Sequence, residues 1–157
     1  MLLLNISINL KGSILSPIYL LNKIDDKIKV VKSNEPSDLQ KNGEWNKFGF
    51  ISIQHPTRIG IEYDLTDYKE WYVKFIEDNY QILINSGVED ISLFLDVFYS
   101  DQCNFEIFNN TQLKKLSLFN ISLPISVYKL SLVKLRDILV KVGYKEETIN
   151  HLFRHEE

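Results

Sequence analysis

Residues 91–108 read ISLFLDVFYSDQCNFEIF, and this stretch sets the pattern of the fold. Apolar residues at every second position from 91 to 99 alternate with Ser92, Phe94, Asp96 and Phe98. After a polar turn at 100–102, Cys103, Phe105 and Ile107 alternate with Asn104, Glu106 and Phe108. A period of two is typical of strands that are buried on one face. The stretch therefore predicts a β-hairpin with an aliphatic face and a second, mixed face.

Residues 2–11, LLLNISINLK, repeat this alternation and predict another strand of the same kind. Further strands are expected at 27–32, at 48–53, at 59–63 after a bend at Pro56, and at 121–128. Pro124 favours an edge position for the last of these, because proline has no N–H to donate to a neighbouring strand. Aliphatic residues on one face of each strand are typical of an antiparallel sheet with one covered side.

Helix signals separate these strands. Ser16 and Pro17 predict the start of a short helix, and apolar spacing from 68 to 83 predicts a long helix that Thr66 caps and Gly87 ends. Asn110 or Thr111 is expected to cap a short helix. Ser131 opens a terminal helix that Gly143 interrupts, so that residues 131–157 form a helical hairpin.

These elements predict an α+β fold. A mostly antiparallel sheet of about five to seven strands packs on one long helix, with short helices and the C-terminal helical hairpin around it. We expect a single domain over residues 1–157, in which residues 1–130 form the sheet core.

Composition excludes several classes of function. The 157 residues carry 18 Lys and Arg against 21 Asp and Glu, a formal charge of −3 that disfavours nucleic acid as a partner. Cys103 is the single cysteine, so an intrachain disulfide is excluded and a cytoplasmic location is expected. No stretch approaches the roughly 20 apolar residues of a membrane span, so no membrane partner is expected.

The mixed sheet face is the first candidate for function. Aromatic anchors among carboxylates suit a protein partner, and the residues expected to bind it are Phe94, Asp96, Phe98, Asp101, Glu106, Phe108 and Tyr128. An alternative is that the C-terminal helices lie across this face and turn its aromatic residues into a second core. Both interpretations remain open at the level of the sequence.

A small polar site is the second candidate. His55 and Arg58 flank Pro56 at a strand break, with Tyr63 and Asp64 nearby, and the polar loop 33–44 could serve as a lid. The spacing matches no catalytic template, so we expect no catalytic residues, no cofactor and no enzymatic activity.

No metal site is expected either. His151 and His155 share a helical face but lack further ligands nearby, and Cys103 is expected in the core.

Three segments carry a resemblance to a known family. Residues 103–108, 113–116 and 120–128 read CNFEIF, LKKL and NISLPISVY, and Pro36, Gly43 and the long helix precede them in matching order. Over roughly the first 130 residues the chain resembles the bacterial domain-of-unknown-function family 4279. The resemblance implies an α+β fold, carries no catalytic residue, and implies an immunity protein that neutralises a toxin domain.

The leading hypothesis is therefore a non-enzymatic cytoplasmic protein, a monomer or homodimer, that binds and neutralises a cognate toxin domain. If that toxin is a basic nuclease, Asp96, Asp101 and Glu106 could occupy the surface that binds phosphates. The alternatives are a small enzyme or ligand-binding domain at the His55 and Arg58 region, and a homo-oligomeric module that buries the open sheet face against itself.

Overall fold

The computed structural model describes residues 1–101 and 104–154, without the side chain of Tyr63. Its strands are β1 (Leu2–Gly12), β2 (Lys29–Asn34), β3 (Gly49–Gln54), β4 (Gly60–Ile61), β5 (Asp90–Tyr99), β6 (Ile121–Ser122) and β7 (Ile125–Lys129). Its helices are α1 (Pro17–Leu21), a 3-10 turn η1 (Glu62–Asp64), α2 (Leu65–Asn85), α3 (Asn110–Leu116), α4 (Leu132–Val142) and α5 (Glu146–Phe153). The α+β prediction is confirmed.

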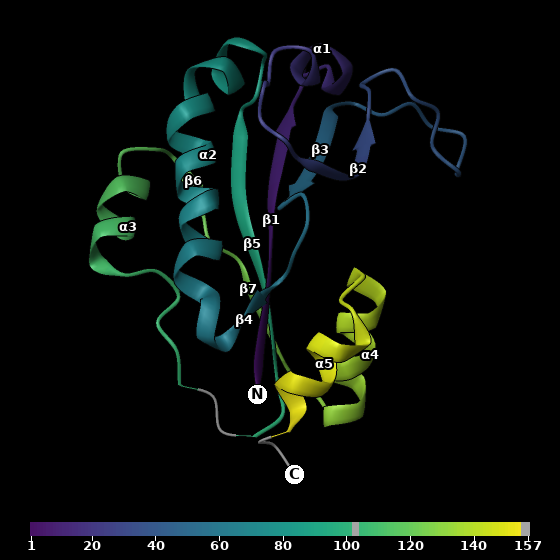
Figure 1. Cartoon of the computed structure of the whole chain (residues 1–157). Coiled ribbons are helices and arrows are strands. Elements are labelled where there is room, and N and C mark those ends of the chain that lie inside the picture. The colour runs from purple at the N-terminus through teal and green to yellow at the C-terminus, as the bar shows by residue number, and fades with distance from the viewer. Residues whose placement is uncertain (102–103, 155–157) are drawn as a thin grey trace.

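All seven strands belong to one mixed sheet with β1 near its centre (Figure 1). β1 pairs antiparallel with β5 along its length, and on its other side with β3 and β4. β2 lies outside β3 at one edge. β6 and β7 form the other edge and run parallel to β5, so Pro124 lies at an edge as the sequence predicted.

The aliphatic face of the sheet is covered by α2. The even-numbered residues of β1 and the odd-numbered residues of β5 from 91 to 97 are buried beneath Tyr68, Tyr72 and Ile76 of this helix. The period of two in the strands and the apolar stripe of α2 thus meet in one main core. The burial of this surface is the dominant favourable term in folding.

Helix boundaries follow local capping chemistry. The Ser16 and Ser131 hydroxyls accept backbone N–H bonds as predicted, and Gly143 ends α4 with a φ of 95°. Two predicted caps are wrong: Thr66 lies inside α2, which begins at Leu65, and α3 is capped by Asn109 rather than by its own first residues.

The predicted hairpin after β5 is wrong. Residues 104–108 form no strand, and Cys103 lies outside the described residues. Phe108 is buried in the main core, and the Lys69 ammonium of α2 donates a 2.7 Å hydrogen bond to the Glu106 carbonyl. The chain thus crosses to the α2 side of the sheet, and α3 forms the crossover that makes β6 and β7 parallel to β5.

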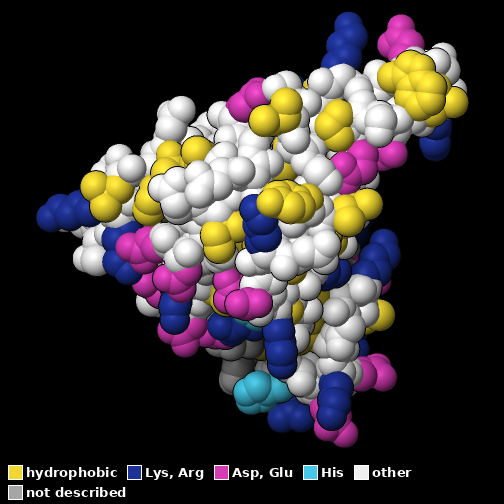
Figure 2. Space-filling view, turned by 90° about the horizontal axis from the view of Figure 1, so that it is seen from above, with side chains coloured by type: hydrophobic (Ala, Val, Ile, Leu, Met, Phe, Trp, Pro, Cys, Tyr) yellow, Lys and Arg dark blue, Asp and Glu magenta, His cyan; other side chains and the backbone are white. Residues whose placement is uncertain are grey.

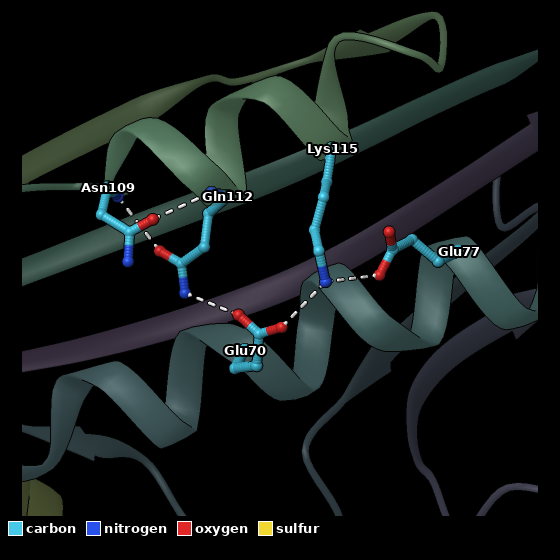
Figure 3. Close-up of polar contacts among 5 residues, drawn as sticks. All are labelled: Glu70, Glu77, Asn109, Gln112 and Lys115. Atoms are coloured by element: carbon cyan, nitrogen blue, oxygen red, sulfur yellow. Dashed lines mark hydrogen bonds and ion pairs between the residues drawn. The ribbon is translucent and has the colours of Figure 1, made fainter.

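Figure 3 shows how α3 docks on α2 through charged contacts. Asn109 and Gln112 form a capping box, and the Gln112 amide donates onward to Glu70 of α2 at 3.1 Å. The Lys115 ammonium lies 3.2 Å from a Glu70 oxygen and 3.0 Å from a Glu77 oxygen. These contacts lower the pKa of Glu70, and the hydrogen bond from Gln112 makes the largest contribution to this shift.

The C-terminal helices α4 and α5 lie on the opposite side of the sheet from α2 (Figure 1). They form a second, smaller core in which Leu135, Leu139 and Ile149 pack with Leu3 of β1, and Phe98 of β5 is partly buried against it. The helices therefore cover one end of the second sheet face, so the interpretation that they form a second core there holds for that end. Partner binding on the rest of the face stays a prediction. No helix of the described chain is long and apolar enough to cross a membrane.

Candidate functional site

The part of the second sheet face that α4 and α5 leave uncovered is the main candidate site. Its side chains alternate with those of the core, and we call it the open face: Asn5, Ser7, Phe50, Gln54, Phe94, Asp96, Ser126 and Tyr128. Tyr128 is exposed and the others are half-buried. Three aromatic rings and a carboxylate on this face provide both apolar and charged contacts for a partner.

A short polar network ties β3, β1 and β5 together on the open face. The Gln54 amide nitrogen of β3 donates to the Asn5 side-chain oxygen at 3.1 Å and to the Ser7 hydroxyl at 3.0 Å. The Asn5 amide nitrogen in turn donates to Asp96 Oδ2 at 3.5 Å. Because Gln54 fixes the Asn5 amide, the donor of that group points toward the carboxylate of β5.

Asp96 is the charged centre of the open face. Burial raises the pKa of its carboxyl, and the hydrogen bond from Asn5 offsets this in part. No lysine or arginine of residues 1–101 and 104–154 forms an ion pair with it. A partly desolvated carboxylate with one long hydrogen bond can accept a cationic group from outside the chain.

A stacked aromatic pair lies where the covered end of the second face meets the open face. Phe98 and Tyr128 are opposite each other in the register of β5 and β7, and their rings stack at 5.4 Å with an interplanar angle of 20°. Phe98 also packs on the core of α4 and α5. The stacking therefore holds the Tyr128 ring in place on the open face.

Three residues predicted for this face lie elsewhere. Phe108 is buried under α2 and α3, and Glu106 is on the α2 side of the sheet, so neither belongs to the open face. Asp101 is exposed but follows the end of β5, beyond Phe98. The structure thus brings together Phe94, Asp96, Phe98 and Tyr128 of the predicted set.

A projecting segment between β2 and β3 was missed as a binding element. Residues 35–48, here called the arm, extend away from the sheet, and hydrophobic side chains gather at its end (Figures 1 and 2). Leu39 and Trp45 face each other across an antiparallel bridge and are 61% and 65% exposed. The sequence predicted a loop at 33–44 that could serve as a lid on the polar site, but no residue of this loop lines the two pockets beside Arg58. The signal for the arm was a tryptophan directly after a polar stretch.

The arm has an internal order of its own. The Gln40 N–H donates to the Glu44 carbonyl at 2.7 Å, and the Asn46 N–H donates to the Asp38 carbonyl at 2.9 Å. The turn between them uses Gly43 at a φ of 82°, which favours glycine. An exposed Trp on a hydrogen-bonded hairpin is the type of residue that dominates protein interfaces.

The second predicted site is partly assembled. The His55 ring lies against Trp71 with ring centroids 5.0 Å apart, and the backbone N–H of His55 donates to the Tyr72 hydroxyl at 2.9 Å. Burial, followed by the nearby Arg58 charge, lowers the pKa of His55. The imidazole Nδ1 accepts from the Thr57 N–H at 3.3 Å, which assigns it a structural role at the strand break.

Arg58 and Asp64 form an ion pair beside this histidine. A pocket of about 370 Å³ lies between this pair and the residues Lys145 and Thr148 at the start of α5. A smaller pocket of about 60 Å³ is lined by Arg58 together with His55 and Gln54. The side chain of Tyr63 lies outside the described part of the structure, so its predicted place here stays a prediction.

The described residues provide no group of three or more His, Cys, Asp or Glu side chains that could hold a metal. His151 lies on α5, whereas His155 and Cys103 lie outside the described residues.

The chain matches no family model, and neither the curated proteins nor the solved structures give a significant match.

Proposed function

We propose that this protein is a non-enzymatic immunity protein that binds a toxin domain on its open face and neutralises it. The observation that carries the proposal is Asp96, a half-buried carboxylate without a cationic partner among the described residues. Phe94 and Tyr128, on the same face, offer apolar anchors beside it.

The chemistry of Asp96 points to a basic group on the partner. A lysine or arginine that reaches the carboxylate would form the ion pair that the chain itself leaves unmade, in a site that is already partly desolvated. In a toxin that cleaves nucleic acid, such basic groups bind phosphates, so Asp96 would compete with the substrate. The association rate would then fall in part as salt is added, because salt screens the attraction between the opposite charges.

The arm supplies a second contact. Leu39 and Trp45 stand clear of the sheet at the end of a hydrogen-bonded hairpin and can enter an apolar pocket of the partner. Together, the open face and the arm provide a charged contact and an aromatic anchor. At protein interfaces a few aromatic anchors contribute most of the binding energy, and complementary charges contribute specificity and a faster association rate.

A ligand-binding role remains the second candidate, because the pocket between Arg58 and Lys145 is the size of a small-molecule site. The Arg58 charge is already paired with Asp64, which lowers its capacity to bind an anion. Arg58→Gln leaves toxin neutralisation unchanged if the open face is the site.

The direct test joins growth rescue with calorimetry. The protein is co-expressed with the toxin domain encoded by the gene immediately upstream, and binding of the two purified proteins is measured. Rescue and nanomolar binding are expected, both lost in Asp96→Lys and both retained in Glu106→Lys, which places the same charge change on the α2 side of the sheet. Absence of binding and rescue refutes the proposed function, and equal losses in the two variants refute the open face as its site.

A further inference from the structure

The aromatic rings of the open face differ in whether the chain supplies them with a partner. The Phe50 ring has the Lys32 ammonium 5.9 Å from its centroid, and the Tyr128 ring stacks on Phe98. Phe94 belongs to neither hydrophobic core and contacts no cation or aromatic ring of the described residues. Within the described part of the open face, Phe94 is therefore the ring that the chain leaves without a partner.

Asp96 follows Phe94 by two residues on β5 and lies on the same face. Positions at this spacing are about 7 Å apart along a strand. The Asp96 carboxylate accepts a hydrogen bond from the Asn5 amide at 3.5 Å, and its Oδ1 atom accepts none from the described residues. The residues opposite Asp96 in the sheet are Asn5 and Ser126, whose side chains are short. A group from outside the chain can therefore reach the carboxylate and the Phe94 ring at the same time.

We propose that Phe94 and Asp96 together bind one arginine side chain of the toxin domain. One edge of a guanidinium carries two parallel N–H groups that match the two oxygens of a carboxylate. Its flat, weakly hydrated faces stack on aromatic rings in a cation–π contact. One cation thus supplies what both residues lack. The inference rests on the proposed function for the identity of the partner, and it adds which basic side chain the open face selects.

A lysine fits these two residues less well. Its ammonium is a compact, strongly hydrated charge, so its contact with the carboxylate leaves no planar surface for the ring. Asp96 is half-buried, and burial raises the pKa of its carboxyl, so hydrogen bonds to its oxygens are stronger than on a fully exposed surface. Arginine offers two such bonds in a fixed geometry, and the open face should therefore prefer arginine to lysine.

An NMR titration of the isotope-labelled full-length protein tests this preference without the toxin domain. The probes are Nα-acetyl-arginine amide and Nα-acetyl-lysine amide, which carry the same charge and differ in the side chain alone. We expect both probes to shift the backbone amide signals of residues 94–96. The dissociation constant of the arginine probe should be lower than that of the lysine probe by at least about threefold.

Four variants separate the ring and the charge from general effects. Asp96→Asn should weaken the binding of both probes. Phe94→Leu should weaken the arginine probe alone and make the two dissociation constants nearly equal, because the ring contact is lost while the carboxylate remains. Glu106→Gln on the α2 side of the sheet and Tyr19→Leu on α1 remove a charge and a ring elsewhere, and they should leave both constants unchanged.

Equal affinity for the two probes overturns the proposal, as does an absence of shifts at residues 94–96. A preference for arginine that Phe94→Leu retains also overturns it. The result is distinguishable from a failure of the proposed function. A protein that neutralises the toxin domain but does not prefer arginine refutes this inference alone, whereas a protein that prefers arginine but binds no toxin domain refutes the proposed function alone.

Discussion

Tyr68 and Tyr72 place their hydroxyl groups 3.1 Å apart at a gap in the sheet. β4 pairs with β1 at Leu3 and Leu4, and β3 pairs from Ile8 onward, so the backbone of Ile6 has no neighbouring strand on that side. The Ile6 N–H donates to the Tyr68 hydroxyl at 3.1 Å, and the Tyr72 hydroxyl donates to the Ile6 carbonyl at 2.7 Å. Because the Tyr72 proton is used there, Tyr68 donates to Tyr72, and the ring of hydrogen bonds is closed.

Removing one hydroxyl from this ring should destabilise the fold. Tyr72→Phe leaves the Ile6 carbonyl and the His55 N–H without their partner, so we expect the free energy of unfolding to fall by about 1–3 kcal/mol. Urea denaturation measures the change. Tyr19→Phe, on an exposed tyrosine of α1, is the control and should stay within about 0.5 kcal/mol of the original chain. Equal stability of Tyr72→Phe and the original chain would contradict the role of the ring.

The same pair predicts alkaline instability. Burial raises the pKa of Tyr68 from 10.0 to about 12 and raises the pKa of Tyr72 further. Above pH 10 the unfolded chain loses these protons while the folded chain keeps them, so the free energy of unfolding should fall as pH rises through this range. Urea denaturation at a series of pH values measures the fall, which should be shallower when both residues are phenylalanine. An identical slope in that double variant would exclude the pair as its source.

Asp96 should lower the stability of the folded chain at neutral pH while it supports binding of the toxin domain. Burial raises the pKa of its carboxyl above 3.8, so the charged form is disfavoured in the folded chain. The free energy of unfolding therefore falls as pH rises from below 3.8 through the raised pKa. Asp96→Asn should therefore raise the melting temperature at neutral pH while abolishing toxin binding in calorimetry. Glu106→Gln, at an exposed position on the α2 side, should change neither. A lower melting temperature for Asp96→Asn would assign the carboxylate a structural role.

The arm can be tested without disturbing the core. Trp45→Ala should change the free energy of unfolding by no more than about 0.5 kcal/mol, because the indole is 65% exposed. Its affinity for the toxin domain should drop by at least about tenfold. Leu118→Ala removes an apolar side chain that is 76% exposed after α3 and serves as the control in the same calorimetric titration. If the two variants bind equally well, the arm is not part of the interface.

Local burial explains what the sequence predicted well. The strands at 2–11 and 91–99 could be predicted because their buried residues occur at every second position. The long helix could be predicted because its apolar residues recur at helical spacing along one buried face. The edge position of Pro124 followed from its missing N–H.

The failures involve contacts made far along the chain. Residues 103–108 alternate like a strand, yet Phe108 is buried by α2 and α3, and a lysine of α2 binds the Glu106 carbonyl. The direction of the last strand depends on the crossover through α3, which periodicity does not report. In the candidate site, the register of β5 and β7 places Phe98 beside Tyr128. Glu106 and Phe108 were assigned to the same face only because a hairpin was predicted there, and the structure has no such hairpin.

The position of β1 has a consequence for how the protein folds. Its centre pairs with a strand that is far along the chain, as in Ile6 with Leu95, and its remaining neighbours, β3 and β4, are also distant. Closing such long loops has an entropic cost that is met before the contacts form, so this topology should fold in milliseconds to seconds rather than microseconds. During synthesis on the ribosome, the apolar strand β1 stays unpaired with β5 until that strand emerges, which makes it the natural segment for a chaperone to hold.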